Sequence, residues 1–135
     1  MIVWDSSMST GVERLDSQHK TLIEKFNELE RAFSEKDTAE ITKTVGDFLD
    51  FLQFYATWHF QQEEECMDQF NCPIAAVNKN FHAVFMKRFN EFYTRWQEGN
   101  MDLDLARETY TAASTWIKNH ILTIDTQLRK VAPQE

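Results

Sequence analysis

Six polar side chains that could bind metal ions recur at helical spacing along this sequence. Glu63 follows His59 by four residues, and Asp125 follows His120 by five, about one helical turn further along. A buried carboxylate costs free energy unless a cation compensates its charge. The pattern therefore indicates a metal site, whose candidate ligands are His19, His59, Glu63, His82, His120 and Asp125.

The ligand types indicate which metal, and how many ions, such a site would hold. Imidazole and carboxylate together favour iron or manganese. Structural zinc usually has cysteine among four ligands, and Cys66 has no second cysteine at ligand spacing. A single ion would leave ligands unused, whereas two ions bridged by both carboxylates, with two histidines on each ion, use all six side chains. The stoichiometry predicts a pair of ions.

Four helices are expected to position these ligands, with one histidine on each helix. Apolar residues that recur every three or four positions place the helices at residues 16–34, 38–68, 74–98 and 103–129. Residues 1–15 show no sustained period and are expected to form an N-terminal arm. A single histidine on an apolar stripe is usually a hydrogen-bonded core residue, but four of them with two carboxylates favour a shared site.

Capping residues support these helix ends. Asp37 with Glu40 reads as a capping pair, Asp102 or Asp104 caps the fourth helix, and Gly99 closes the third. Short connections between helices imply antiparallel neighbours. We therefore expect an all-α fold, an antiparallel up-down-up-down four-helix bundle, with residues 1–135 as a single domain.

Composition excludes several classes of partner. A net charge of −8 and a pI near 5.0 argue against nucleic acid, which requires a basic face. The most hydrophobic stretch, Phe48 to Phe60, contains Asp50 and His59, so no membrane span is expected. No secretory signal is visible, so a cytoplasmic location is expected, with Cys66 and Cys72 reduced and packed in the core. The sequence identifies no partner protein.

Three segments together resemble the hemerythrin family, particularly its bacterial single-domain members. The first follows Trp4 and reads GVERLDSQHK, from Gly11 to Lys20. The second reads HFQQEE, from His59 to Glu64, with Met67 and Pro73 after it. The third reads WIKNHI and is followed by Asp125. Each piece alone is weak, but their order and spacing cover nearly the whole chain and make a specific signal.

The resemblance implies a non-haem di-iron centre that binds dioxygen or another small diatomic ligand. By that resemblance His19 and His59 bind one iron, and His82 and His120 bind the other. Glu63 and Asp125 bridge the two irons.

One position departs from the family pattern. The family has a further histidine four residues before the one matched by His82, and this sequence has Asn78 there. The usual site has one closed iron with three histidines and one open iron with two, so here both irons would be open. Asn78 could act as a weak ligand, hold a water molecule, stay outside the ligand shell, or only adjust the site. The departure puts reversible oxygen carriage in question.

Three classes of function remain. The first is a dioxygen-binding carrier, store or sensor, and the second is a di-iron enzyme or responder acting on nitric oxide, peroxide or dioxygen. The third is a metal-free helical interaction module.

Four aromatic residues are expected either to form a dry pocket at the site or simply to fill the core, namely Phe26, Phe81, Phe85 and Trp116. Glu64 and Glu65 are expected to be solvated.

Overall fold

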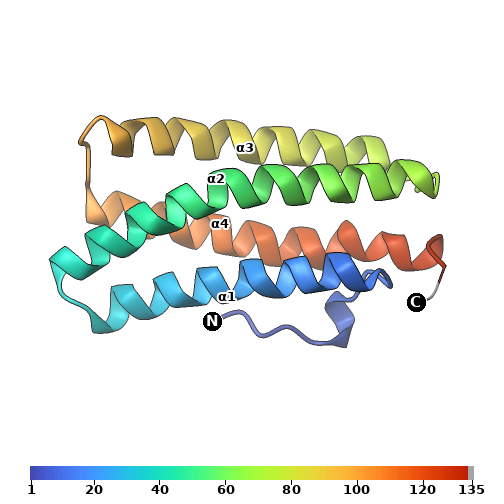
Figure 1. Cartoon of the computed structure of the whole chain (residues 1–135), viewed down its shortest axis with the longest axis horizontal. Coiled ribbons are helices and arrows are strands. Elements are labelled where there is room, and N and C mark those ends of the chain that lie inside the picture. The colour runs from blue at the N-terminus through green and yellow to red at the C-terminus, as the bar shows by residue number, and fades with distance from the viewer. Residues whose placement is uncertain (134–135) are drawn as a thin grey trace.

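Four long helices alternate in direction along the chain in the computed structural model, which describes residues 1–133, so that consecutive helices are antiparallel (Figure 1). The described residues contain no strand, so the predicted all-α four-helix bundle is confirmed. The long helices are α1 (Glu13–Glu35), α2 (Thr38–Gln69), α3 (Ala75–Gln97) and α4 (Leu103–Thr123). Two short 3-10 helices flank them, η1 (Ser6–Met8) and η2 (Asp125–Lys130).

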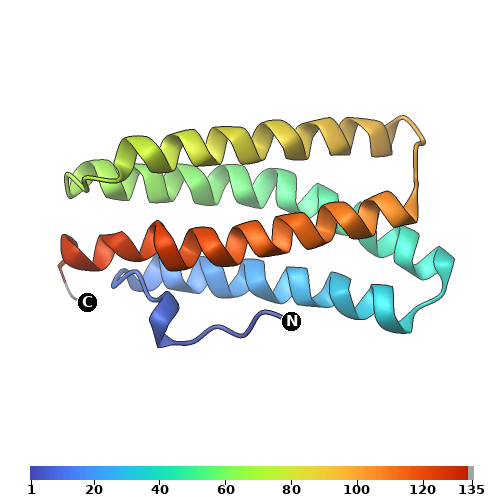
Figure 2. The ribbon, with the colours of Figure 1, turned by 180° about the vertical axis from the view of Figure 1, so that it is seen from behind.

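The N-terminal arm runs along the outside of the bundle beside α1, as both views show (Figures 1 and 2). Asp16 anchors it: its carboxylate accepts hydrogen bonds from Ser9 Oγ at 2.7 Å and from the Thr10 amide at 2.8 Å. Helix α1 begins at Glu13, before the predicted start at residue 16, because the Val12 carbonyl already accepts from the amides of Leu15 and Asp16. The first two residues of the helix, Glu13 and Arg14, are exposed and polar, so no apolar period marks them as helical.

The predicted caps are in place at three helix ends. The Asp37 carboxylate accepts from the Glu40 amide at 2.9 Å, and Asp102 accepts from the amides of Asp104 and Leu105. Gly99 closes α3 with a φ of 92°, a conformation that glycine adopts without a steric cost. These caps keep the connections short, which holds neighbouring helices antiparallel.

The fourth helix ends earlier than predicted. It stops at Thr123 instead of continuing to residue 129, and the chain then follows the tighter η2. On a continuous α-helix, a residue five positions after His120 would point about 140° away from it. In η2, by contrast, Asp125 faces His120, and its Oδ1 atom lies 3.1 Å from His120 Nε2.

Two apolar clusters fill the interior, and His59 and His120 lie at the edge of the larger one, next to Phe60 and Ile121. The other four candidate ligands lie between the two clusters along the sequence, namely His19, Glu63, His82 and Asp125. On α1, for example, Leu15 belongs to the smaller cluster and Leu22 to the larger one, with His19 between. Cys66 and Cys72 are both buried and belong to the smaller cluster, in agreement with packing roles. The bundle therefore buries a polar layer between two dry ones.

Candidate metal centre

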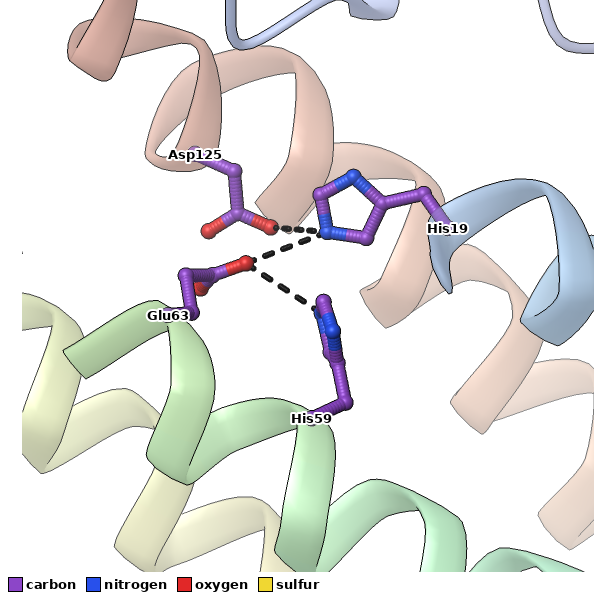
Figure 3. Close-up of side chains that lie close together, drawn as sticks. All are labelled: His19, His59, Glu63 and Asp125. Atoms are coloured by element: carbon purple, nitrogen blue, oxygen red, sulfur yellow. Dashed lines mark hydrogen bonds and ion pairs between the residues drawn. The ribbon is translucent and has the colours of Figure 1, made fainter. Parts of the chain in front are cut away.

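Four of the candidate ligands form a first set, drawn from α1, α2 and η2 (Figure 3). His19 Nε2 lies 3.1 Å from Glu63 Oε2 and 3.1 Å from Asp125 Oδ2. His59 Nε2 lies 3.2 Å from the same Glu63 oxygen. All four side chains are at most 2% exposed. Their donor atoms therefore converge on one small volume that solvent does not reach.

A second set faces the first across the two carboxylates. His82 Nε2 lies 3.1 Å from Glu63 Oε1, and His120 Nε2 lies 3.1 Å from Asp125 Oδ1. The two histidine nitrogens are 3.2 Å apart. Each carboxylate thus directs one oxygen to each set. The structure brings together all six side chains singled out in the sequence, in two groups of four that share Glu63 and Asp125.

The chemistry of the cluster fits cations. Burial alone would lower the pKa of His19, but its hydrogen bonds to Asp125 and Glu63 outweigh that effect and raise the pKa to about 10. Burial would likewise raise the pKa of Glu63, but hydrogen bonds from His19, His59 and His82 hold it well below its usual range. Asp125 Oδ1 is buried without a hydrogen-bond partner. The site attracts positive charge and leaves a donor atom for a metal ion to use.

Two further side chains orient the ring nitrogens. His59 Nδ1 donates to Gln18 Oε1 at 2.6 Å, and His82 Nδ1 donates to Glu64 Oε2 at 2.9 Å. A proton on Nδ1 leaves Nε2 as the lone-pair donor toward the cluster. Sequence reasoning missed Gln18, and the expectation that Glu64 is simply solvated was wrong. Ligating histidines usually have such a partner, but Gln18 and Glu64 contact histidines on other helices, so the sequence shows only that each lies next to a candidate ligand.

Asn78 is fully buried beside the second set. Its Oδ1 lies 2.8 Å from His120 Nε2, and its Nδ2 donates to Glu63 Oε1 at 3.2 Å. The amide therefore contacts a candidate ligand of one ion and a candidate bridge between both. The Asn78 N–H group and the His82 Nε2 atom thus face the same Glu63 oxygen, Oε1.

Aromatic rings cover the histidines of the second set. Phe60 stacks on His82 with ring centroids 3.8 Å apart, and Trp116 stacks on His120 at 4.5 Å. Phe81 meets His120 edge-on, whereas the rings that contact Phe26 belong to Phe48 and Tyr110, so Phe26 is a core residue. Phe60, which sequence reasoning did not single out, lies directly on a candidate ligand.

The chain matches the family model of the Hemerythrin HHE cation binding domain over residues 10–132. It belongs to the hemerythrin family. This family binds a non-haem di-iron centre, so the cofactor predicted from the sequence, two iron ions, is confirmed. The finding argues against a metal-free interaction module.

Hemerythrin-family relatives match over most of this chain. A bacteriohemerythrin of Stenotrophomonas maltophilia (strain R551-3) is 35% identical over 121 residues, which cover 90% of this chain and 74% of the relative. One of Pseudomonas aeruginosa (strain LESB58) is 31% identical, covering 92% and 76%. One of Clostridium acetobutylicum is 26% identical, covering 93% and 96%. In the part of this hemerythrin-family chain that the structure describes, no helix is both long and apolar enough to cross a membrane.

Gln18 and Glu64, which accept from the Nδ1 atoms of His59 and His82, should each affect the binding of a different iron. We expect Gln18→Ala to weaken iron binding at the first set, because it removes the acceptor that orients His59, and Glu64→Gln to weaken it at the second, because it replaces the charged acceptor of His82 with a neutral one. Each effect should be about 10- to 100-fold. Iron release to a chelator, followed as two kinetic phases, measures both. Glu65→Gln changes an exposed neighbour of the same type and should leave both phases unaltered. Identical effects from all three variants would contradict separate tuning.

Proposed function

We propose that this hemerythrin-family protein holds two irons through the six buried side chains and binds dioxygen there as a carrier, store or sensor. His19 and His59 would hold one iron, His82 and His120 the other, and Glu63 and Asp125 would bridge them. The observation that carries the proposal is the division of each carboxylate's two oxygens between the two sets. Two ferrous ions held by these residues would supply the electrons for reversible binding of dioxygen.

The surroundings suit a ligand that must bind and leave unchanged. Phe60 and Trp116 cover the second pair of histidines, and Glu63 and Asp125 are buried. A dry site restricts access of water, which would otherwise displace a bound apolar gas or bring protons to it. The protonated Nδ1 atoms of His59 and His82 are held by Gln18 and Glu64, so these side chains keep the rings oriented whether or not a gas is bound.

The purified protein should carry about two irons per chain, since two bridging carboxylates with four imidazoles use two ions fully. Elemental analysis measures the metal content. The ferrous protein should then gain visible absorption on mixing with dioxygen and lose it when dioxygen is removed. One iron per chain or stoichiometric zinc would contradict the di-iron assignment, and an irreversible change would contradict reversible binding.

A second candidate function is supported by Asn78. An asparagine amide is a weaker ligand than imidazole, so the second iron would keep a more open position, which favours reaction at the centre with nitric oxide, peroxide or dioxygen. Release of a product during decay of the dioxygen complex would distinguish this enzyme or responder from a carrier. Decay with no product other than dioxygen itself would favour the carrier.

A further inference from the structure

An apolar groove of about 330 Å³ lies between α3 and α4. These two helices contact each other more sparsely than the other neighbouring pairs in the bundle do. The groove floor consists largely of aromatic rings, contributed by Phe85, Phe89, Phe92 and Trp116. Its volume falls within the range of small-molecule sites, and its open side would leave part of a bound molecule in water.

The α3 rim of the groove is positively charged. Arg88, Glu91 and Arg95 line it, and all three are exposed. Among the residues that the structure describes, neither arginine has a salt bridge. The opposite rim, on α4, has the small residues Thr109 and Ala112. Since the whole chain has a net charge of −8, this excess of cationic groups beside an apolar floor is a local feature.

We propose that the groove binds a small amphipathic carboxylate of the medium-chain fatty acid type. Its apolar chain would lie on Phe85 and Trp116, where burial of apolar surface is favourable. Its carboxylate would pair with the rim arginines, whose guanidinium groups match carboxylate geometry. A neutral apolar molecule would leave this charge unused, and a dication would be repelled by it.

The floor of the groove is continuous with the rings that cover the second set. Phe85 stacks on Trp116 with centroids 4.4 Å apart, and Trp116 stacks on His120 at 4.5 Å. A molecule on the groove floor would therefore lie one ring away from a candidate iron ligand. This link rests on the proposed function, and it implies that groove binding and iron chemistry influence each other reciprocally.

Calorimetric titration of the iron-loaded protein with decanoate, below the micellar concentration, tests the site. We expect saturable binding of one molecule per chain, lost in Ala112→Phe because the added ring fills the groove from its exposed rim. Ala39→Phe places the same ring on an exposed part of α2 that does not line the groove and should bind like the unaltered protein. No saturable binding, or equal binding by Ala112→Phe, would overturn the proposal.

A second comparison tests the charge. The double variant Arg88→Gln with Arg95→Gln should bind decanoate about fivefold more weakly, as expected for loss of exposed ion pairs. Lys43→Gln with Lys87→Gln removes the same charge from exposed positions outside the groove and should change little. Decanol binding as tightly as decanoate would overturn the assignment of a carboxylate. A dimer that forms with increasing protein concentration and is abolished by Ala112→Phe would also overturn it, because a second copy of this chain would then occupy the groove.

The same titration, followed by visible absorption of the ferric protein, tests the link to the irons. Saturation should shift the spectrum at the decanoate concentration that calorimetry reports, and an unchanged spectrum would refute the link. Iron content is measured separately on each sample. Two irons per chain without decanoate binding would refute only the groove site, whereas decanoate binding to a chain with one iron would refute only the di-iron assignment.

Discussion

Replacing Glu63 with alanine is expected to remove both irons and leave well below one iron per chain. The Glu63 Oε2 atom lies 3.1 Å from His19 Nε2 and 3.2 Å from His59 Nε2, while Oε1 lies 3.1 Å from His82 Nε2. The variant therefore deprives both sets of an anionic donor at once. Alanine also leaves three histidines without the carboxylate that their ring nitrogens face. Elemental analysis of the purified variant measures the loss, and its helical circular dichroism shows whether the bundle has formed.

Two further variants distinguish loss of a bridging ligand from general destabilisation. Glu65→Ala removes an exposed carboxylate from the same helix and should retain two irons. His19→Ala removes a donor from the first set only, so it should weaken one iron preferentially and leave the other bound. If Glu63→Ala kept one iron, Glu63 would belong to a single ion. If all three variants lost metal equally, general destabilisation would explain the loss and the bridging assignment would fail.

Asn78→His should hold iron more firmly and give a longer-lived dioxygen complex. The Asn78 side chain already lies among the second set, with Oδ1 2.8 Å from His120 Nε2, so an imidazole at this position can reach the same ion. A stronger neutral ligand in place of an amide should slow iron loss roughly tenfold. It should also occupy the open position, which would slow any reaction with nitric oxide or peroxide that needs it. Stopped-flow spectra of the ferrous proteins mixed with dioxygen, nitric oxide or peroxide measure the lifetime of the dioxygen complex and the rates of reaction. Iron release to a chelator measures iron retention.

The position is fully buried, so the larger side chain also tests the packing. Overpacking typically costs about 1 to 3 kcal/mol, and thermal unfolding of the iron-loaded variant would reveal such a cost. Asn80→His makes the same change at an exposed site on α3 and should leave iron retention and gas binding unchanged. Unchanged retention and complex lifetime in Asn78→His, with a normal fold, would show that position 78 does not influence the open site and would favour the carrier.

Helical periodicity predicted the bundle well because each ligand shares a stripe with apolar residues. The spacing of His59 and Glu63 places both on one face of α2, and the structure brings them to within 3.2 Å. The same reasoning worked less well for Asp125. Five residues after His120 is a poor spacing on a regular helix, and the Asp125 carboxylate reaches the site from η2, which follows the end of α4 at Thr123. Sequence periodicity cannot show such a local change.

The residues missed by sequence reasoning are those that act through long-range contacts. Gln18 and Glu64 carry no apolar period, and their partners lie on other helices. Phe60 sits beside His59 in sequence but covers His82, a contact that depends on how α2 and α3 pack. Side-chain type and spacing thus identified the donors, whereas the groups that orient and cover them required the three-dimensional arrangement.

The donors of the polar layer come from every long helix and from η2, and this arrangement makes an ion at the layer a cross-link. Ions held between His19 and Asp125 would close loops that together enclose most of the chain. Closing long loops restricts the unfolded chain most and so favours the folded state. The lifetime of the folded protein in the cell would then follow the supply of iron, and a chain made during iron scarcity would be the first to reach proteases. The metal centre would then be a cross-link that forms only when iron is present, so the abundance of the protein would depend on the supply of iron.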